Sequence, residues 1–138
     1  MLNKEVQTLI YNALTASSAL AGIAVDKNYH DYDGKTSIVY SQLSNVPHFH
    51  SDNQEKYTRV SFQLSVMGDD EEPLDKIYDE IERIMIEKLG FKIISREELS
   101  EDESASGTLY YLIGRFVKVF PADYKYSEEI YIYESDWR

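Results

Sequence analysis

The clearest pattern in the chain is strict alternation of apolar and polar residues between Thr58 and Met67. The apolar positions are Val60, Phe62, Leu64 and Val66, and the polar positions between them are Arg59, Ser61, Gln63 and Ser65. Successive side chains of a β-strand point to opposite faces of a sheet. The segment therefore predicts a strand with one buried face and one solvent-facing side.

Three further segments carry strand signals. Ser37–Ser44 is rich in β-branched and aromatic residues, and we expect it to end at Asn45-Val46-Pro47 because proline cannot donate to a ladder. Phe91–Ser95 predicts a short strand. Thr108–Phe120 predicts a long one with apolar residues on both faces, and Gly114 in its middle predicts either a bulge or a close backbone approach.

Two segments have the three- and four-residue spacing of amphipathic helices. Near the N-terminus, Asn3 can cap a helix whose apolar residues are Val6, Leu9, Ile10, Ala13 and Leu14. The second helix follows the acidic turn 68–73. Its apolar stripe runs from Leu74 to Leu89, and Gly90 ends it.

The remaining segments predict connections. Val46–Lys56 is expected to be a loop, and Arg96–Ser106 an acidic, mobile excursion between strands, because it shows no periodicity. Residues 121–138 predict either a C-terminal arm ordered by a neighbouring subunit or a last edge strand. The whole chain, 1–138, is thus expected to be a single α+β domain in which a mainly antiparallel sheet packs against two helices.

The amino-acid composition limits the kinds of partner that the chain can bind. With 138 residues, of which 43% are hydrophobic, the chain can bury one sizeable core. Its 25 acidic and 14 basic residues give a net charge of −11, which repels nucleic-acid phosphates and anionic lipids. No stretch reaches the ~18 apolar residues of a membrane span. We therefore expect neither a sequence-specific nucleic-acid partner nor a membrane, and synthesis in the cytoplasm.

Catalytic chemistry finds little support in the sequence. The absence of cysteine excludes disulfides and thiolate metal sites. The nearest approach to a metal motif is His48-x-His50-x-Asp52, for which a structural or interfacial role is favoured because a closed site needs more ligands. Nucleophile elbows and phosphate-binding glycine loops are missing as well. We expect a protein that is not an enzyme and has no catalytic, cofactor-binding or metal-binding residues.

Twelve tyrosines are a more informative feature. They are concentrated near the C-terminus, where the aromatic residues are Tyr124, Tyr126, Tyr131, Tyr133 and Trp137. A rigid apolar ring with a polar tip suits protein interfaces, but the same residues would also suit an edge strand packed on its own core. Both interpretations remain open.

The order of the segments resembles a known family. A helix containing residues 11–20 precedes strands at 37–42 and 60–67, a helix at 74–89 and a long strand ending at 115–119. This order is similar, over roughly residues 1–120, to that of the tail-completion and tail-terminator proteins of long-tailed bacteriophages and prophages. The resemblance implies a virion assembly protein that caps the tail tube and forms the tail side of the head-tail joint as a hexameric ring.

The resemblance also implies partners and a location. The partners would be the tail tube protein and the head-tail connector protein. The free subunit could be a monomer, and the assembled protein would be located in the tail or neck of the virion. An acidic ring lumen would let DNA pass without adhering. The alternatives are another head-tail connector or minor tail component, or a bacterial protein-binding adaptor domain.

Overall fold

The computed structural model describes residues 2–28, 35–51, 54–103 and 107–127, with the backbone alone described at 47–51, 54–56 and 101–103. Two helices, two short helical turns and five strands make up this part of the chain. In order they are α1 (Leu2–Thr15), η1 (Ser18–Leu20), β1 (Ala24–Lys27), β2 (Ser37–Ser51), β3 (Gln54–Gly68), α2 (Glu71–Arg83), η2 (Ile84–Lys88), β4 (Lys92–Glu103) and β5 (Gly107–Pro121).

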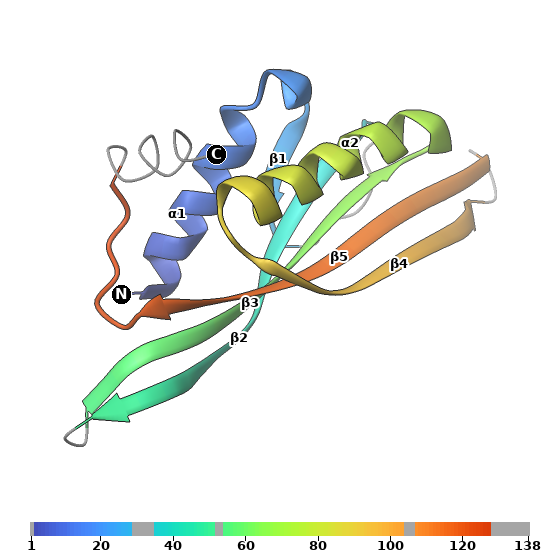
Figure 1. The fold of residues 1–138 in the computed structure, drawn as a ribbon. Coiled ribbons are helices and arrows are strands. Elements are labelled where there is room, and N and C mark those ends of the chain that lie inside the picture. The colour runs from blue at the N-terminus through green and yellow to red at the C-terminus, as the bar shows by residue number, and fades with distance from the viewer. Residues whose placement is uncertain (1, 29–34, 52–53, 104–106, 128–138) are drawn as a thin grey trace.

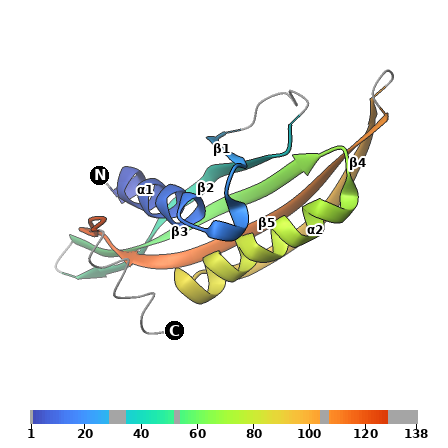
Figure 2. The same cartoon turned by 90° about the horizontal axis from the view of Figure 1, so that it is seen from above.

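The strands form one sheet in the order β1-β2-β3-β5-β4 (Figure 1). All neighbours are antiparallel except β1 and β2, which are parallel. Both helices pack on the same face of this twisted sheet, as the view from above shows (Figure 2). The α+β class expected from the sequence is confirmed.

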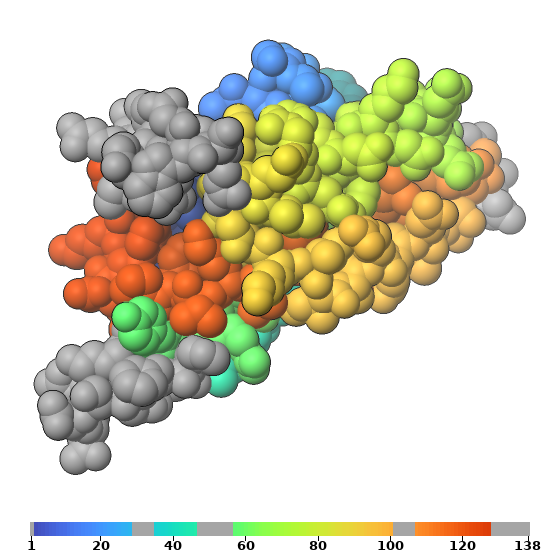
Figure 3. Space-filling view, in the orientation of Figure 1, coloured from blue at the N-terminus to red at the C-terminus, as the bar shows by residue number. Residues whose placement is uncertain are grey.

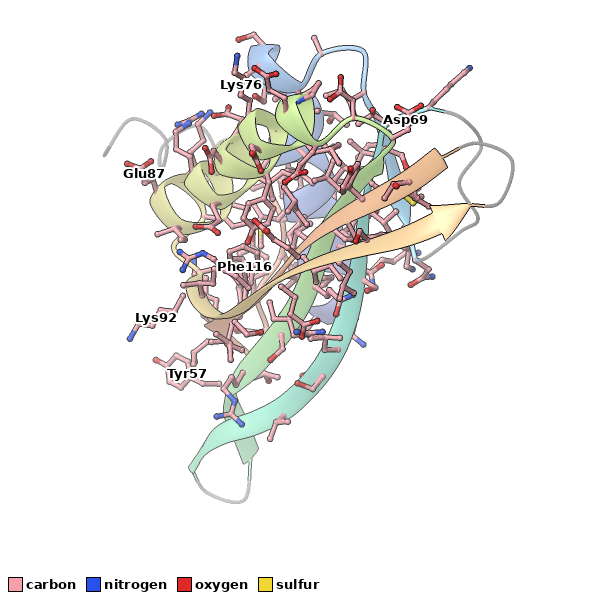
Figure 4. All side chains as sticks on the ribbon, turned by 90° about the vertical axis from the view of Figure 1, so that its right-hand side faces the viewer. Tyr57, Asp69, Lys76, Glu87, Lys92 and Phe116 are labelled. Carbon is pink, nitrogen blue, oxygen red and sulfur yellow. The ribbon has the colours of Figure 1, made fainter. Side chains whose placement is uncertain are left out.

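The main core lies between the helices and the sheet. The alternation in β3 is confirmed, because its apolar residues Val60, Phe62, Leu64 and Val66 are all fully buried. They pack with the buried faces of both helices, and Phe116 of β5 points into the same layer (Figure 4). A second, smaller cluster on the opposite face contains Val39, Met67, Leu109, Tyr111 and Ile113.

The N-terminal end of the first helix is hydrogen-bonded to the sheet. It begins at Leu2, so that Asn3 lies inside the helix and does not form the cap that the sequence predicted. The Asn3 side-chain oxygen instead accepts hydrogen bonds from the amide nitrogens of Gln42, at 2.9 Å, and Asn45. This residue therefore fixes α1 to strand β2.

The expected end of the second strand was wrong. β2 continues through Asn45-Val46-Pro47 to Ser51, with bulges on both sides of Val46. The parallel partner β1 pairs only as far as Tyr40, so among the described residues no strand lies on the outer side of β2 at Pro47. Proline is tolerated on strands with an open edge, which is the situation of β2 at this position.

The expected excursion at Arg96–Ser106 was also wrong over its described residues. β4 extends to Glu103 and pairs with β5 along its length. It is the last strand of the sheet, and residues 96–100 are all exposed. With neither face buried, the strand has no need of alternating apolar residues, which explains the missing periodicity.

The described part of the C-terminal segment is not a strand. After a turn that follows Pro121, the chain returns to the first helix, where the Tyr126 N–H donates to the Glu5 carboxylate at 3.1 Å. Tyr124 packs on Phe120, with ring centroids 4.9 Å apart. These two tyrosines thus pack on the chain's own core. Tyr131, Tyr133 and Trp137 lie outside the described residues.

Gly114 is a place of close approach between helix and sheet, as one of the two sequence interpretations predicts. Gly114 itself is not bulged, because it pairs directly with Leu64 and Arg96; the nearest register shift lies in β4, between Ile93 and Ser95. A Cβ atom at this position would lie 2.3 Å from the Tyr78 hydroxyl oxygen and 2.9 Å from the Phe116 ring. Only glycine leaves room for Tyr78 beneath α2.

We expect Gly114→Ala to lower the free energy of unfolding by about 1–3 kcal/mol, because the added methyl group overpacks the core. Urea unfolding measures this loss. The double variant Y78F/G114A removes the nearest clashing atom and should lose less than Gly114→Ala alone. A single variant as stable as the parent would contradict the close approach.

A second link connects η1 with α2. The Ser17 hydroxyl donates to the Glu80 carboxylate at 2.7 Å, and Arg83 donates to the same carboxylate at 2.6 and 2.8 Å. These hydrogen bonds, with that from Arg83 the largest cause, lower the pKa of Glu80 to about 2. The ionised carboxylate is thus favoured in the folded state.

Glu80→Gln should therefore lower stability by about 1–3 kcal/mol at pH 7. A carboxylate with a lowered pKa stabilises the fold at pH values above its ordinary pKa of 4.5. This contribution to stability is lost as the pH falls toward 2. Urea unfolding of parent and variant at pH 7 and pH 3 should show a difference that shrinks by more than half. Glu87→Gln, on an exposed carboxylate, is the control. An equal difference at both pH values would refute the assignment.

Candidate interaction surfaces

The described side chains do not form a metal centre or a membrane-spanning helix. Among the described residues, no group of three or more histidine and carboxylate side chains is placed to hold a metal ion. No helix within the described ranges is long and apolar enough to cross a membrane. The backbone of His48 and His50 lies in β2, while Asp52 lies outside the described residues, so the role of this motif stays open.

The first prominent surface is a projecting β-hairpin, which we call the arm and define as residues 48–51 and 54–56. The last pairing of β3 with β5 joins Tyr57 to Pro121, and β1 reaches only to Tyr40 on the other side. Beyond these points β2 and β3 pair only with each other, as far as the structure describes the chain, and extend away from the rest of the sheet (Figure 1). An isolated two-stranded ribbon is marginally stable in water, so the arm is suited to packing against a partner.

Exposed apolar residues lie at the base of the arm, on the sheet face without helices. Val46, Tyr57 and Val119 are 40%, 44% and 38% exposed, and we call them the arm-root patch. Val46 and Val119 lie on either side of Arg59 in one row across β2, β3 and β5. Tyr57 projects from the same side of the sheet as Lys92 (Figure 4). The patch therefore combines apolar surface with basic side chains.

The second surface is a groove between α2 and β4, which lie side by side on the face shown in Figure 3. Its volume is about 480 Å³, and a smaller hollow of about 220 Å³ shares Glu98 and Leu112 with it. The charged residues that line the groove are Asp75, Asp79 and Glu82 of α2 and Arg96, Glu97 and Glu98 of β4. We call it the acidic groove.

Only some of these charges are neutralised. Arg96 donates to both oxygens of Glu82, at 2.7 and 2.9 Å, and Arg115 donates to Glu97 at 2.7 Å. The bond from Arg96 is the main cause that lowers the pKa of Glu82. Within the described part of the chain, Asp75, Asp79 and Glu98 have no ion-pair partner. The groove is left with unpaired negative charge.

Tyr78 forms part of the groove wall. Burial is the main cause that raises the pKa of its hydroxyl, and the nearby Glu82 carboxylate raises the pKa further. The hydroxyl oxygen is buried, and no described group is placed to hydrogen-bond it with good geometry. It therefore stays protonated at neutral pH.

Neither surface was foreseen from the sequence. The arm lies in a segment expected to be a loop, and one side of the acidic groove lies in a segment expected to be mobile. The carboxylates of α2 at positions 75, 79 and 82 have helical spacing, which does place them on one side of the helix. The facing carboxylate Glu98 comes from β4, a pairing partner that sequence periodicity could not reveal.

Comparison with known proteins adds no assignment. No family model matches the sequence, and no curated protein matches it significantly. The similarity to tail-completion proteins consequently remains a prediction.

Proposed function

We propose that this chain is a non-enzymatic tail-completion protein that caps a phage tail tube and forms the tail side of the head-tail joint as a ring. The observation that carries the proposal is the arm. Its two strands extend past the end of β5 and pair with no third strand among the described residues. Such a ribbon gains stability by packing on a neighbouring molecule.

The geometry of the arm suits a closed ring. In a head-to-tail interface, one surface of a subunit contacts a different surface of the next, and the ring closes if the rotation allows. The arm of one subunit would pack beside the arm-root patch of its neighbour. Burying Val46, Tyr57 and Val119 in this way removes the exposed apolar surface at the base of the arm.

The charge of the chain is compatible with the same role. A net charge of −11 would let DNA pass through the ring without adhering to its lumen. The proposed partners are the tail tube protein below the ring and the head-tail connector protein above it. The second candidate is a protein-binding adaptor domain, for which the acidic groove is the supporting observation.

The test combines self-association with tube binding. Purified chain is mixed with tail tubes of the phage or prophage whose genome encodes it, and electron microscopy is used to look for a ring at one tube end. A tube-free sample measures self-association. A discrete ring at the tube end is expected, whereas a chain that neither binds tubes nor self-associates would favour the adaptor.

The double variant V46D/V119D should abolish the ring and weaken subunit association more than about tenfold, because burying unpaired carboxylates is strongly unfavourable. Leu99→Asp is the matched control, since Leu99 is 48% exposed on the distant strand β4. Sedimentation velocity measures association, and thermal unfolding verifies that all variants fold. Rings formed equally by V46D/V119D would exclude the arm-root patch as an interface.

A further inference from the structure

Strand β4 has a free edge. β4 is the terminal strand of the sheet, and within the described ranges it pairs with β5 alone. Residues 96–100 are exposed, so the backbone N–H and C=O groups on the outer side of the strand can accept another strand. Edges of this kind bind extended peptides in many protein complexes.

The charge of this edge selects the kind of strand that can pair with it. The acidic residues of β4 are Glu97, Glu98, Glu101, Asp102 and Glu103, against the basic residues Lys92 and Arg96. Pairing two copies of β4 would bring carboxylates opposite carboxylates, which is destabilising. The edge therefore disfavours a second copy of itself and favours a basic strand.

We propose that the β4 edge and the acidic groove together bind an extended, lysine- or arginine-rich segment of a partner protein, which adds a sixth strand to the sheet. The inference goes beyond tail completion and holds whether or not the chain forms a ring. A basic segment is the expected ligand of this site because its charge is complementary to the unpaired carboxylates of Asp75, Asp79 and Glu98.

Strand geometry predicts the pattern of the bound segment. Glu98 lies on the helix side of β4, where it pairs with Leu112, whereas the exposed Leu99 lies on the opposite side. Alternate side chains of an added strand would follow the same two sides. Basic residues at every second position would reach the acidic groove, and apolar residues between them would lie next to Leu99.

The hydroxyl of Tyr78 supplies an independent observation at the same place. Tyr78 lines the acidic groove and is 92% buried, and within the described part of the chain its hydroxyl oxygen makes no hydrogen bond of good geometry, although the Glu82 carboxylate lies near enough to raise its pKa. Unsatisfied buried polar groups are rare and costly in native proteins. An ammonium or guanidinium group that entered the groove beside Glu82 could donate to this oxygen.

The probe is an acetylated and amidated octapeptide of alternating lysine and valine. It is titrated into the full-length, isotope-labelled chain, backbone amide shifts are followed by NMR, and calorimetry gives Kd. Shifts should be concentrated in β4 and on the groove side of α2, and binding should weaken with added salt. An alternating glutamate and valine peptide should not bind.

Two N-methylated peptides separate strand addition from simple charge attraction. One carries N-methyl groups on the valines and the other on the lysines, so their charge is unchanged. Only the set of N–H groups that faces β4 is needed, because the other set points to the new outer edge. One methylated peptide should therefore lose binding, and the other should retain it.

The groove is tested by conservative variants. Asp79→Asn and Glu98→Gln should each weaken binding about two- to fivefold, as expected for the loss of one partly exposed ion pair. Glu87→Gln makes the same charge change on the outward side of the helix end (Figure 4) and should leave Kd unchanged. Each variant is first shown to fold by its NMR spectrum.

Several results would overturn the inference. They are the absence of peptide binding, equal binding of both methylated peptides, and amide shifts concentrated on α1 or the arm. If Glu87→Gln and Glu98→Gln changed Kd equally, the peptide would be attracted by the overall charge of the chain and not by the acidic groove. Broadening of the β4 amides with rising protein concentration in the absence of peptide would show that a second copy occupies the edge.

Discussion

The position of α2 on the sheet is constrained most tightly at one contact, that between Tyr78 and Gly114. β5 is paired on both sides, by β3 and β4, so its backbone cannot move away from the helix. Tyr78 fits only because residue 114 has no side chain. With the helix fixed at this point, Asp75, Asp79 and Glu82 lie along the same groove as β4. The packing of the core thus determines where the acidic groove forms.

The connection between α2 and β4 holds these two elements next to each other. The helix widens into a π-turn at its end, where the Leu89 N–H donates to the Ile84 carbonyl at 3.0 Å. Gly90 then adopts a φ of +76°, a conformation that glycine enters at little cost, and the chain reverses into the edge strand. Lys118 of β5 donates to the Leu89 carbonyl and ties this corner to the sheet. Because α2 and β4 are adjacent in sequence, the groove is formed largely by one local unit.

Sequence patterns predicted the fold wherever one face of a segment is buried. β3 and both helices have such a face, and their apolar residues recur with the period of the element. Residues 96–100 of β4 have no buried face, so no period marks them, and Pro47 reads as a strand end although no described strand lies on the outer side of β2 there. β1 was missed because four residues gain their strand conformation from a distant partner. The interaction surfaces follow these open edges, which is why the sequence did not reveal them.

The two open surfaces differ in charge, and this difference bears on what each can bind. Copies of a chain with a net charge of −11 repel one another, so self-association requires a contact with little local negative charge. The arm-root patch meets this condition, because Val46 and Val119 lie beside Arg59 and no acidic residue is in their row. The β4 edge does not, since its carboxylates would oppose those of another copy. On physical grounds we expect the two surfaces to bind different partners. The arm side would contact other copies of this chain, and the β4 side would bind a different, basic protein.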